Sequence, residues 1–155
     1  MNKIYNVIFA ALAVLTFAFA TSCEKDDEMP VTYLEVNAAN LHGNWMLESI
    51  NGQPLKSGTY FYINFDRSGN RFCIWETLTS IPSSPNVDEG TFSIGTDPEA
   101  GAYIRGIGTS LEEWADCYIV KGLTSDSMTW TGVNDPSFVQ TFRRVEEIPF
   151  EKESF

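Results

Sequence analysis

Histidine, cysteine and positive charge are scarce in this sequence. One His and three Cys among 155 residues leave little material for a metal site. The chain has 10 Lys and Arg residues against 21 Asp and Glu residues, which gives a net charge of −11. Because nucleic-acid binding depends on neutralising phosphates, this balance argues against a nucleic-acid partner. We therefore expect neither a metal nor a nucleic acid.

Catalytic motifs are also scarce. His42 is the single histidine, and residues 106–108, Gly-Ile-Gly, lack the third Gly and the following helix of a phosphate-binding loop. Neighbouring carboxylates such as Asp88 and Glu89 point to opposite faces of a strand, so they do not form an acid/base pair. We expect no enzymatic activity and no cofactor.

The first residues form a candidate export signal. Lys3 precedes an apolar run over residues 4–20, and its uninterrupted core, residues 7–15, is too short to remain in a bilayer as a spanning helix. Small residues then lead into Cys23. This pattern resembles the lipobox of bacterial lipoproteins, which implies that residues 1–22 are a signal peptide and that Cys23 carries the lipid. A plain signal peptide cut nearby, leaving an unmodified Cys, is the alternative.

An acidic segment follows the candidate lipid-attachment site. Its residues 25–27, Lys-Asp-Asp, look like the surface-export signal of Bacteroidetes lipoproteins, although acidic runs are usually solvated spacers. Residues 23–39 are therefore expected to be an acylated N-terminus and an acidic tether. Since anionic membrane surfaces repel an acidic protein, the acyl chains must supply the attachment. We expect a lipid-anchored protein of the bacterial outer membrane, exposed at the cell surface.

The remainder of the chain has the composition of one all-β domain. Apolar residues make up 43% of the sequence and aromatic residues 14%, which suits half-buried pleated strands. Turn residues separate short apolar runs, and no long segment has a helical period. Short connections require antiparallel neighbours, and closure removes exposed edges. The sequence predicts an eight-stranded up-and-down antiparallel β-barrel with strands over residues 44–50, 59–65, 71–78, 88–94, 102–107, 115–123, 127–132 and 138–145.

A short motif opens the first predicted strand. Gly43 and Trp45 form Gly-x-Trp, and the last strand ends with two Arg residues, of which Arg144 shares a face with Phe142. Together with the strands and the lipobox, this resembles the lipocalins, and more closely the lipocalin-like domain lipoproteins of Bacteroidetes, over residues 40–146. The resemblance implies that Trp45 packs at the closed floor of the barrel with Arg144 over its ring, a cation on a π face. The alternative is that both Arg residues are surface side chains.

Hairpin pairing assigns side chains to the barrel interior. A four-residue turn pairs Phe61 with Glu76 and directs one apolar set inward: Phe61, Ile63, Phe65, Phe72 and Ile74. The same reasoning after Leu123 places Ile119 and Lys121 with Trp130 on the interior face. The opposite face, with Tyr118 and Val120, remains an open alternative.

The order of the strands predicts which loops surround the open end. If Trp45 begins the first strand at the floor, the loops over residues 51–58 and 78–87 lie at the mouth, and the longer one is a candidate lid. We expect Phe61, Glu76 and Trp130 to contact a ligand there. A solvated Glu76 at a frayed strand end is the alternative.

Two functions follow from these expectations, and residues 147–155 are left as a C-terminal tail. The first is a lipid-anchored binding protein for a small apolar or amphipathic ligand, or for a glycan or peptide at the mouth. The second is a filled barrel without a cavity that acts as an accessory or inhibitory subunit of an envelope complex. The volume left inside the barrel distinguishes the two.

Overall fold

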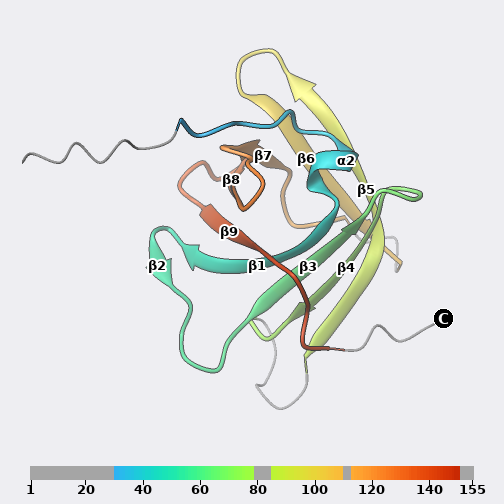
Figure 1. Ribbon diagram of the computed structural model, residues 1–155, viewed down its shortest axis with the longest axis vertical. Helices are drawn as coiled ribbons and strands as arrows, with labels where there is room; N and C mark the ends of the chain where they lie inside the picture. The colour runs from blue at the N-terminus through green and yellow to red at the C-terminus, as the bar shows by residue number, and fades with distance from the viewer. Residues whose placement is uncertain (1–29, 79–84, 110–112, 151–155) are drawn as a thin grey trace, which may run out of the picture. The chain divides into compact units, whose positions relative to one another are not determined.

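The computed structural model describes residues 30–78, 85–109 and 113–150. In this described part, one antiparallel sheet runs in the order β2-β1-β3-β4-β5-β6-β7-β8-β9 and closes by pairing β1 with β9. The short β2 pairs only with the end of β1, so the other eight strands form the barrel (Figure 1). The predicted up-and-down barrel is confirmed. Its strands are β1 Gly43–Ile50, β2 Gln53–Pro54, β3 Phe61–Asp66, β4 Arg71–Glu76, β5 Asn86–Asp97, β6 Gly101–Gly108, β7 Tyr118–Lys121, β8 Ser127–Gly132 and β9 Val139–Val145.

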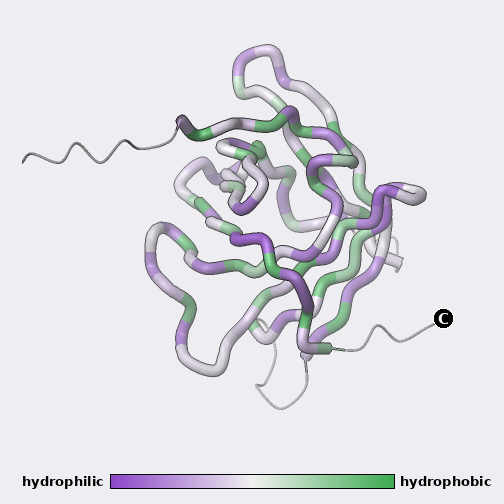
Figure 2. The backbone as a smooth tube through the Cα atoms, viewed as in Figure 1, coloured by the Kyte–Doolittle hydropathy of each residue, from purple (hydrophilic) through white to green (hydrophobic). Residues whose placement is uncertain are grey.

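The β3–β4 hairpin has the register that the sequence predicted. Phe61 pairs with Glu76, and the pairs further along the hairpin alternate between the two faces of the sheet. Ile63 and Phe65 are fully buried, because their face of the hairpin is directed into the barrel. Figure 2 shows the hydrophilic turn that joins the two strands. The length of the turn and the alternation of apolar residues specify the same pairing, so two separate features of the sequence determine the register.

The β7–β8 hairpin differs from the prediction by one residue. Val120 pairs with Trp130, and Lys121 pairs with Thr129. At the turn, Thr124 N donates to Ser127 O at 2.8 Å, which is a register one residue away from that of the strands. Gly122, at φ 59°, is the additional residue that makes up the difference. As a result Val120 faces the core with Trp130, and the predicted interior position of Lys121 is wrong.

Residues that were expected to belong to the tether instead close one end of the barrel. Leu34, Val36 and Ala38 pack against the buried core, and Leu34 N donates to Leu123 O at 2.7 Å. A short helix, α2 Ala38–Leu41, follows them across this end (Figure 1). Its Leu41 is completely buried. The folded domain therefore begins before residue 40, because these apolar side chains cover the core.

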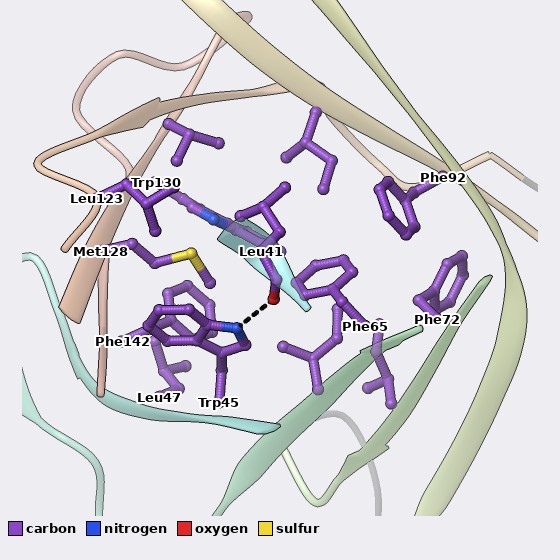
Figure 3. Close-up of a cluster of buried hydrophobic side chains, with 14 residues drawn as sticks. Leu41, Trp45, Leu47, Phe65, Phe72, Phe92, Leu123, Met128, Trp130 and Phe142 are labelled. Atoms are coloured by element: carbon purple, nitrogen blue, oxygen red, sulfur yellow. Dashed lines mark hydrogen bonds between the residues drawn. The ribbon is translucent and has the colours of Figure 1, made fainter. Parts of the chain in front are cut away.

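One hydrophobic cluster fills the barrel next to this closed end. Figure 3 shows Trp45 and Leu47 of β1 packed together with Met128, Phe142 and Leu41 in the interior. Phe65 and Phe92 meet edge to face with 5.0 Å between their centroids, and Trp130 meets Phe142 at a tilt with 4.6 Å between theirs. Such offset contacts fill space without voids. The closed end of the barrel is therefore filled by packed side chains, and any free volume lies toward the open end.

The described C-terminal residues lie on the outside of the barrel. The ring of Phe150 stacks on Tyr60 with 4.8 Å between centroids and lies 6.0 Å from that of Tyr62. This segment therefore covers part of the outer face of β3. Within the described ranges, no helix is long and apolar enough to cross a membrane.

Candidate functional site

The floor of the barrel is organised by Trp45 and Arg144. The Arg144 Cζ atom lies 4.1 Å from the centroid of the Trp45 ring, which is the stacked contact that the lipocalin resemblance implied. The Trp45 Nε1–H donates to Leu41 O at 2.8 Å, and the side chain is fully buried. A cation on an indole face adds to this packing. The two side chains therefore join β1, β9 and the α2 segment.

Arg144 also donates hydrogen bonds to backbone carbonyls of the segments that close the floor. Its Nε donates to Ser125 O at 2.6 Å, and its two terminal nitrogens donate to Asn40 O at 2.8 Å and to His42 O. Burial lowers the pKa of this guanidinium from its usual value, while the carboxylate of Asp126 opposes the shift. Arg143, by contrast, makes an exposed ion pair with Glu48 at 2.9 Å. The alternative with two equivalent surface Arg residues is therefore wrong.

Gly43 is required by the close approach of Arg144. Its φ is 121°, a conformation that side-chain-bearing residues rarely adopt, and a Cβ atom there would lie 2.6 Å from Arg144 Nη1. The structure therefore explains both defined residues of the Gly-x-Trp motif. Gly removes the steric obstacle, and Trp supplies the surface on which the guanidinium rests.

We expect Gly43→Ala to lower the free energy of unfolding by about 1–3 kcal/mol, because it adds backbone strain and displaces the guanidinium. Gly58→Ala is the matched control, since Gly58 also has a positive φ, 83°, but no atom of the described residues lies within 4 Å of the place a Cβ would take. The control should cost about 1 kcal/mol. Chemical denaturation measures both variants. Equal effects would show that the approach of Arg144 does not constrain this position.

His42 lies at the floor of the barrel. Its Nδ1 lies 2.9 Å from Phe65 O, and the residue is exposed overall. Among the described residues, no group of three or more His, Cys, Asp or Glu side chains is placed to hold a metal ion.

A small cavity remains at the mouth, above the filled floor. Its volume is about 160 Å³. It lies between inward side chains of β3, β4, β8 and β9 and the segment that precedes β7. The residues that line it are Phe61, Ile74, Trp114, Ala115, Tyr118, Trp130 and Gln140. The structure thus brings together two of the three predicted ligand contacts, Phe61 and Trp130.

Trp114 is a cavity residue that the sequence did not predict. Its ring covers Gly106 of β6, where a Cβ atom would lie 2.1 Å from Trp114 Cε2. The backbone N–H of Trp114 also donates to Gly106 O at 3.0 Å. Trp114 lies between a predicted loop and a predicted strand. The alternation of side chains along a strand therefore could not assign it to the inner or the outer face of the barrel. The signal that was available is Gly106, since a small residue on an interior face leaves room for a large ring.

Glu76 is the predicted contact that does not line the cavity. Its register with Phe61 is as predicted, but β4 ends at Glu76 and the side chain is half-buried. Its Oε1 accepts from Asn86 Nδ2 at 2.9 Å at an exposed position on the rim. The predicted interior position of Glu76 is therefore wrong, while its contact with a ligand stays a prediction. A carboxylate at the end of a strand reaches a polar partner at the rim more readily than an apolar interior.

Three aromatic side chains form one wall of the cavity. The centroid of Trp130 lies 5.2 Å from that of Tyr118, at an interplanar angle of 26°, and 5.6 Å from that of Trp114. Burial raises the pKa of Tyr118 from its usual value, and the nearby Asp116 adds to the shift. Its hydroxyl is therefore protonated at neutral pH. The wall is aromatic and uncharged.

The structure describes only part of the loops predicted at the mouth. Residues 51–58 are described, whereas residues 79–84 of the candidate lid lie outside the described ranges, as do Cys23 and the predicted signal peptide. The sequence of this chain was also compared with known proteins. No family model matches it, and no curated protein matches it.

Proposed function

We propose that this protein is a lipid-anchored binding protein of the bacterial outer membrane, with a small amphipathic ligand held at the mouth of its barrel. The observation that carries this proposal is the cavity of about 160 Å³ between Phe61, Trp114 and Trp130. Preformed, mostly apolar concave sites with a few polar groups are typical of small-molecule binding.

The rigid floor supports this assignment. Because the cluster around Trp45 fills the closed end, the walls of the cavity rest on side chains that cannot rearrange without loss of packing. A site held in this way loses little conformational freedom on binding. The described lining residues are apolar, aromatic or amide side chains, so they offer binding surface but no acid or base that titrates near neutral pH. The proposal is therefore a binding function and not a catalytic one.

The experiment that tests the proposal is native mass spectrometry of the full-length protein extracted from the membranes of its own cells. We expect a retained small molecule, present at one copy per chain and lost on denaturation. Protein that is uniformly free of any small molecule, and that also fails to bind single-ring compounds afterwards, would contradict the proposal.

The proposed lipid anchor at Cys23 can be tested separately. Cys23→Ala should abolish partition into the detergent phase and leave either an uncleaved precursor or a soluble protein, because acylation requires the thiol. Cys117→Ala is the matched control and should partition like the wild type. Phase separation and the mass of the N-terminal peptide measure the outcome. Wild-type protein with no acyl mass on Cys23 would contradict the lipoprotein assignment.

A second candidate is the accessory subunit of an envelope complex. It is favoured by an outer groove of about 400 Å³, larger than the inner cavity, that runs between the β5–β6 hairpin and the outer face of β7 and β8. Tyr103, Ile119 and Val133 give this groove apolar surface. Its charged residues are of both signs: Arg105 and Lys121, and Asp97 and Glu99. Recovery of a stoichiometric protein partner in the same native extract, without a small molecule, would favour this candidate.

A further inference from the structure

Gln140 of β9 is a buried polar side chain at the mouth cavity. It is 6% exposed, and its side-chain amide makes no hydrogen bond with any residue that the structure describes. Thr77, the other buried polar residue of the described part, is paired, since its Oγ1 accepts from Tyr60 N at 3.0 Å. Nearly all buried polar groups in native proteins are paired, because an unpaired one has lost water without a replacement. Gln140 therefore points to a partner that the described residues do not supply.

The amide of Gln140 is directed into the cavity. Gln140 pairs with Trp130 of β8 and with Ile50 at the end of β1, which places it on the inner face near the open end. It is one of the residues that line the cavity. Within the described ranges, the only fully enclosed side-chain polar atoms without a partner are the indole nitrogens of Trp114 and Trp130. Both polar atoms of the Gln140 amide therefore keep accessible surface, and the cavity is where an inward side chain can have it.

The backbone around Gln140 is held in place. Asn51 N donates to Val139 O at 2.7 Å, and Val139 N donates to Asn51 Oδ1 at 2.7 Å. The next inward residue of β9, Phe142, is fully buried in the core. A polar group presented from such a fixed strand loses little conformational freedom when it binds a ligand.

The chemistry of an amide restricts its partner. A primary amide carries N–H donors beside a C=O acceptor, so a second amide that presents the same pair in reverse satisfies both at once. A ketone or an ether leaves the Gln140 oxygen without a donor. A carboxylate also supplies acceptors only, and among the described residues no charged side chain lines the cavity to offset its lost hydration. The site therefore favours an uncharged donor–acceptor pair.

The walls around Gln140 restrict the rest of the ligand. Phe61, Ile74 and the neighbouring rings of Tyr118 and Trp130 give the cavity apolar surface. An apolar cavity of about 150 Å³ accommodates a benzene-sized molecule, and the space here is about 160 Å³. It therefore holds one ring or a short branched chain beside the amide. Because the cavity is open at the mouth, the remainder of a larger molecule can extend out of it.

We propose that the mouth cavity recognises an uncharged amide, a carboxamide or a lactam on a small apolar body, through the side-chain amide of Gln140. This inference rests on the proposed function, since it names the ligand class of the same cavity. The ligand N–H donates to Gln140 Oε1, and the ligand carbonyl accepts from Gln140 Nε2. Ordered water is the competing partner, because the cavity has room for it.

Two probes of the same shape test this inference on the full-length protein. Benzamide carries the donor–acceptor pair, whereas acetophenone has a methyl group in place of the NH₂ group. Calorimetry gives the two affinities. We expect benzamide to bind about three- to tenfold more tightly, the difference that one net hydrogen bond supplies. Benzoate, which is charged, should bind more weakly than benzamide.

A ¹H–¹⁵N spectrum locates the contact. Selective ¹⁵N labelling of glutamine side chains gives two pairs of signals, because the sequence contains only Gln53 and Gln140. The signals of Gln140 should move when benzamide binds. Those of Gln53, which is exposed in β2, should not.

Conservative variants separate the amide from the rest of the wall. Gln140→Met keeps an unbranched side chain of similar length but removes both polar atoms, so it should no longer bind benzamide more tightly than acetophenone. Gln53→Met is the matched control, because Gln53 is exposed and is not among the cavity residues. It should retain the full preference. If Gln140→Met does not fold, the glutamine signals of the wild type decide the question.

The outcomes distinguish this inference from the proposal on which it rests. Equal affinities for benzamide and acetophenone with unmoved Gln140 signals, or a preference that survives in Gln140→Met, would overturn the amide inference and leave a cavity that binds rings. Tighter binding of benzoate would overturn the uncharged class. If neither probe binds while the native extract holds a small molecule, the inference alone fails. If neither probe binds and the extract is empty, both the inference and the proposed function fail.

Discussion

Trp45→Ala should lower the free energy of unfolding by about 3–5 kcal/mol, the range for truncating a fully buried aromatic side chain. Trp45 is 0% exposed, its N–H satisfies Leu41 O, and its ring supports the Arg144 guanidinium. The variant loses all three contacts and leaves a cavity in the floor. Trp45→Phe should fall between the wild type and the Ala variant, because it keeps a ring but loses the hydrogen bond.

The matched control for this substitution is Val31→Ala, since Val31 is 63% exposed. It should change the free energy of unfolding by less than about 0.5 kcal/mol. Denaturant titration of the three variants measures the differences. A Trp45→Ala variant as stable as Val31→Ala would show that Trp45 does not organise the floor.

Arg144→Ala should lower the free energy of unfolding by about 2–4 kcal/mol, because charge-assisted hydrogen bonds to Asn40 O, His42 O and Ser125 O are lost with the stacked cation. Arg144→Lys should recover only part of this, since an ammonium group does not reproduce the planar fork. The same titration measures each variant.

The neighbouring arginine gives the contrast. Arg143→Ala removes an exposed ion pair with Glu48 and should cost less than about 1 kcal/mol. Similar losses for Arg143→Ala and Arg144→Ala would mean that the two side chains are equivalent surface charges, contrary to the geometry at Trp45.

The sequence predicted those parts of the barrel where two local signals agree. In the β3–β4 hairpin, the length of the turn and the apolar alternation specify the same pairs, and the structure has them. At the floor, the resemblance to lipocalins implied the stacked contact that is observed, and the face shared with Phe142 selected Arg144 rather than Arg143 for it. Local patterns are reliable there because a one-residue slip would expose every buried side chain.

The prediction of which side chains face inward failed where one extra residue shifts the strand register, and where the chain has no regular secondary structure. Gly122 adds a residue between the turn and β7, and this reverses the faces of Ile119 and Lys121. Residues 34–41 pack on the core without the periodicity of a strand or a long helix, so most of them were assigned to the tether. Trp114 reaches the cavity from an irregular segment over Gly106. Such contacts depend on tertiary packing, which alternation does not encode.

The position of Glu76 illustrates the same limit at the cavity. Register paired it with Phe61 correctly, yet the end of β4 allows its carboxylate to take Asn86 at the rim. The cavity is therefore less polar than the sequence suggested. Among its described lining residues, polar groups come from Tyr118 and Gln140, because the indole nitrogens of Trp114 and Trp130 are buried.

A crystal structure of the lipoprotein purified from its own membranes tests most directly whether the mouth of this barrel holds a small molecule. We predict continuous density for one small molecule in the mouth cavity, in contact with Phe61, Trp114 and Trp130. A cavity that contains only separate water molecules, or one filled by a shifted Trp114 ring, would contradict the proposed binding function.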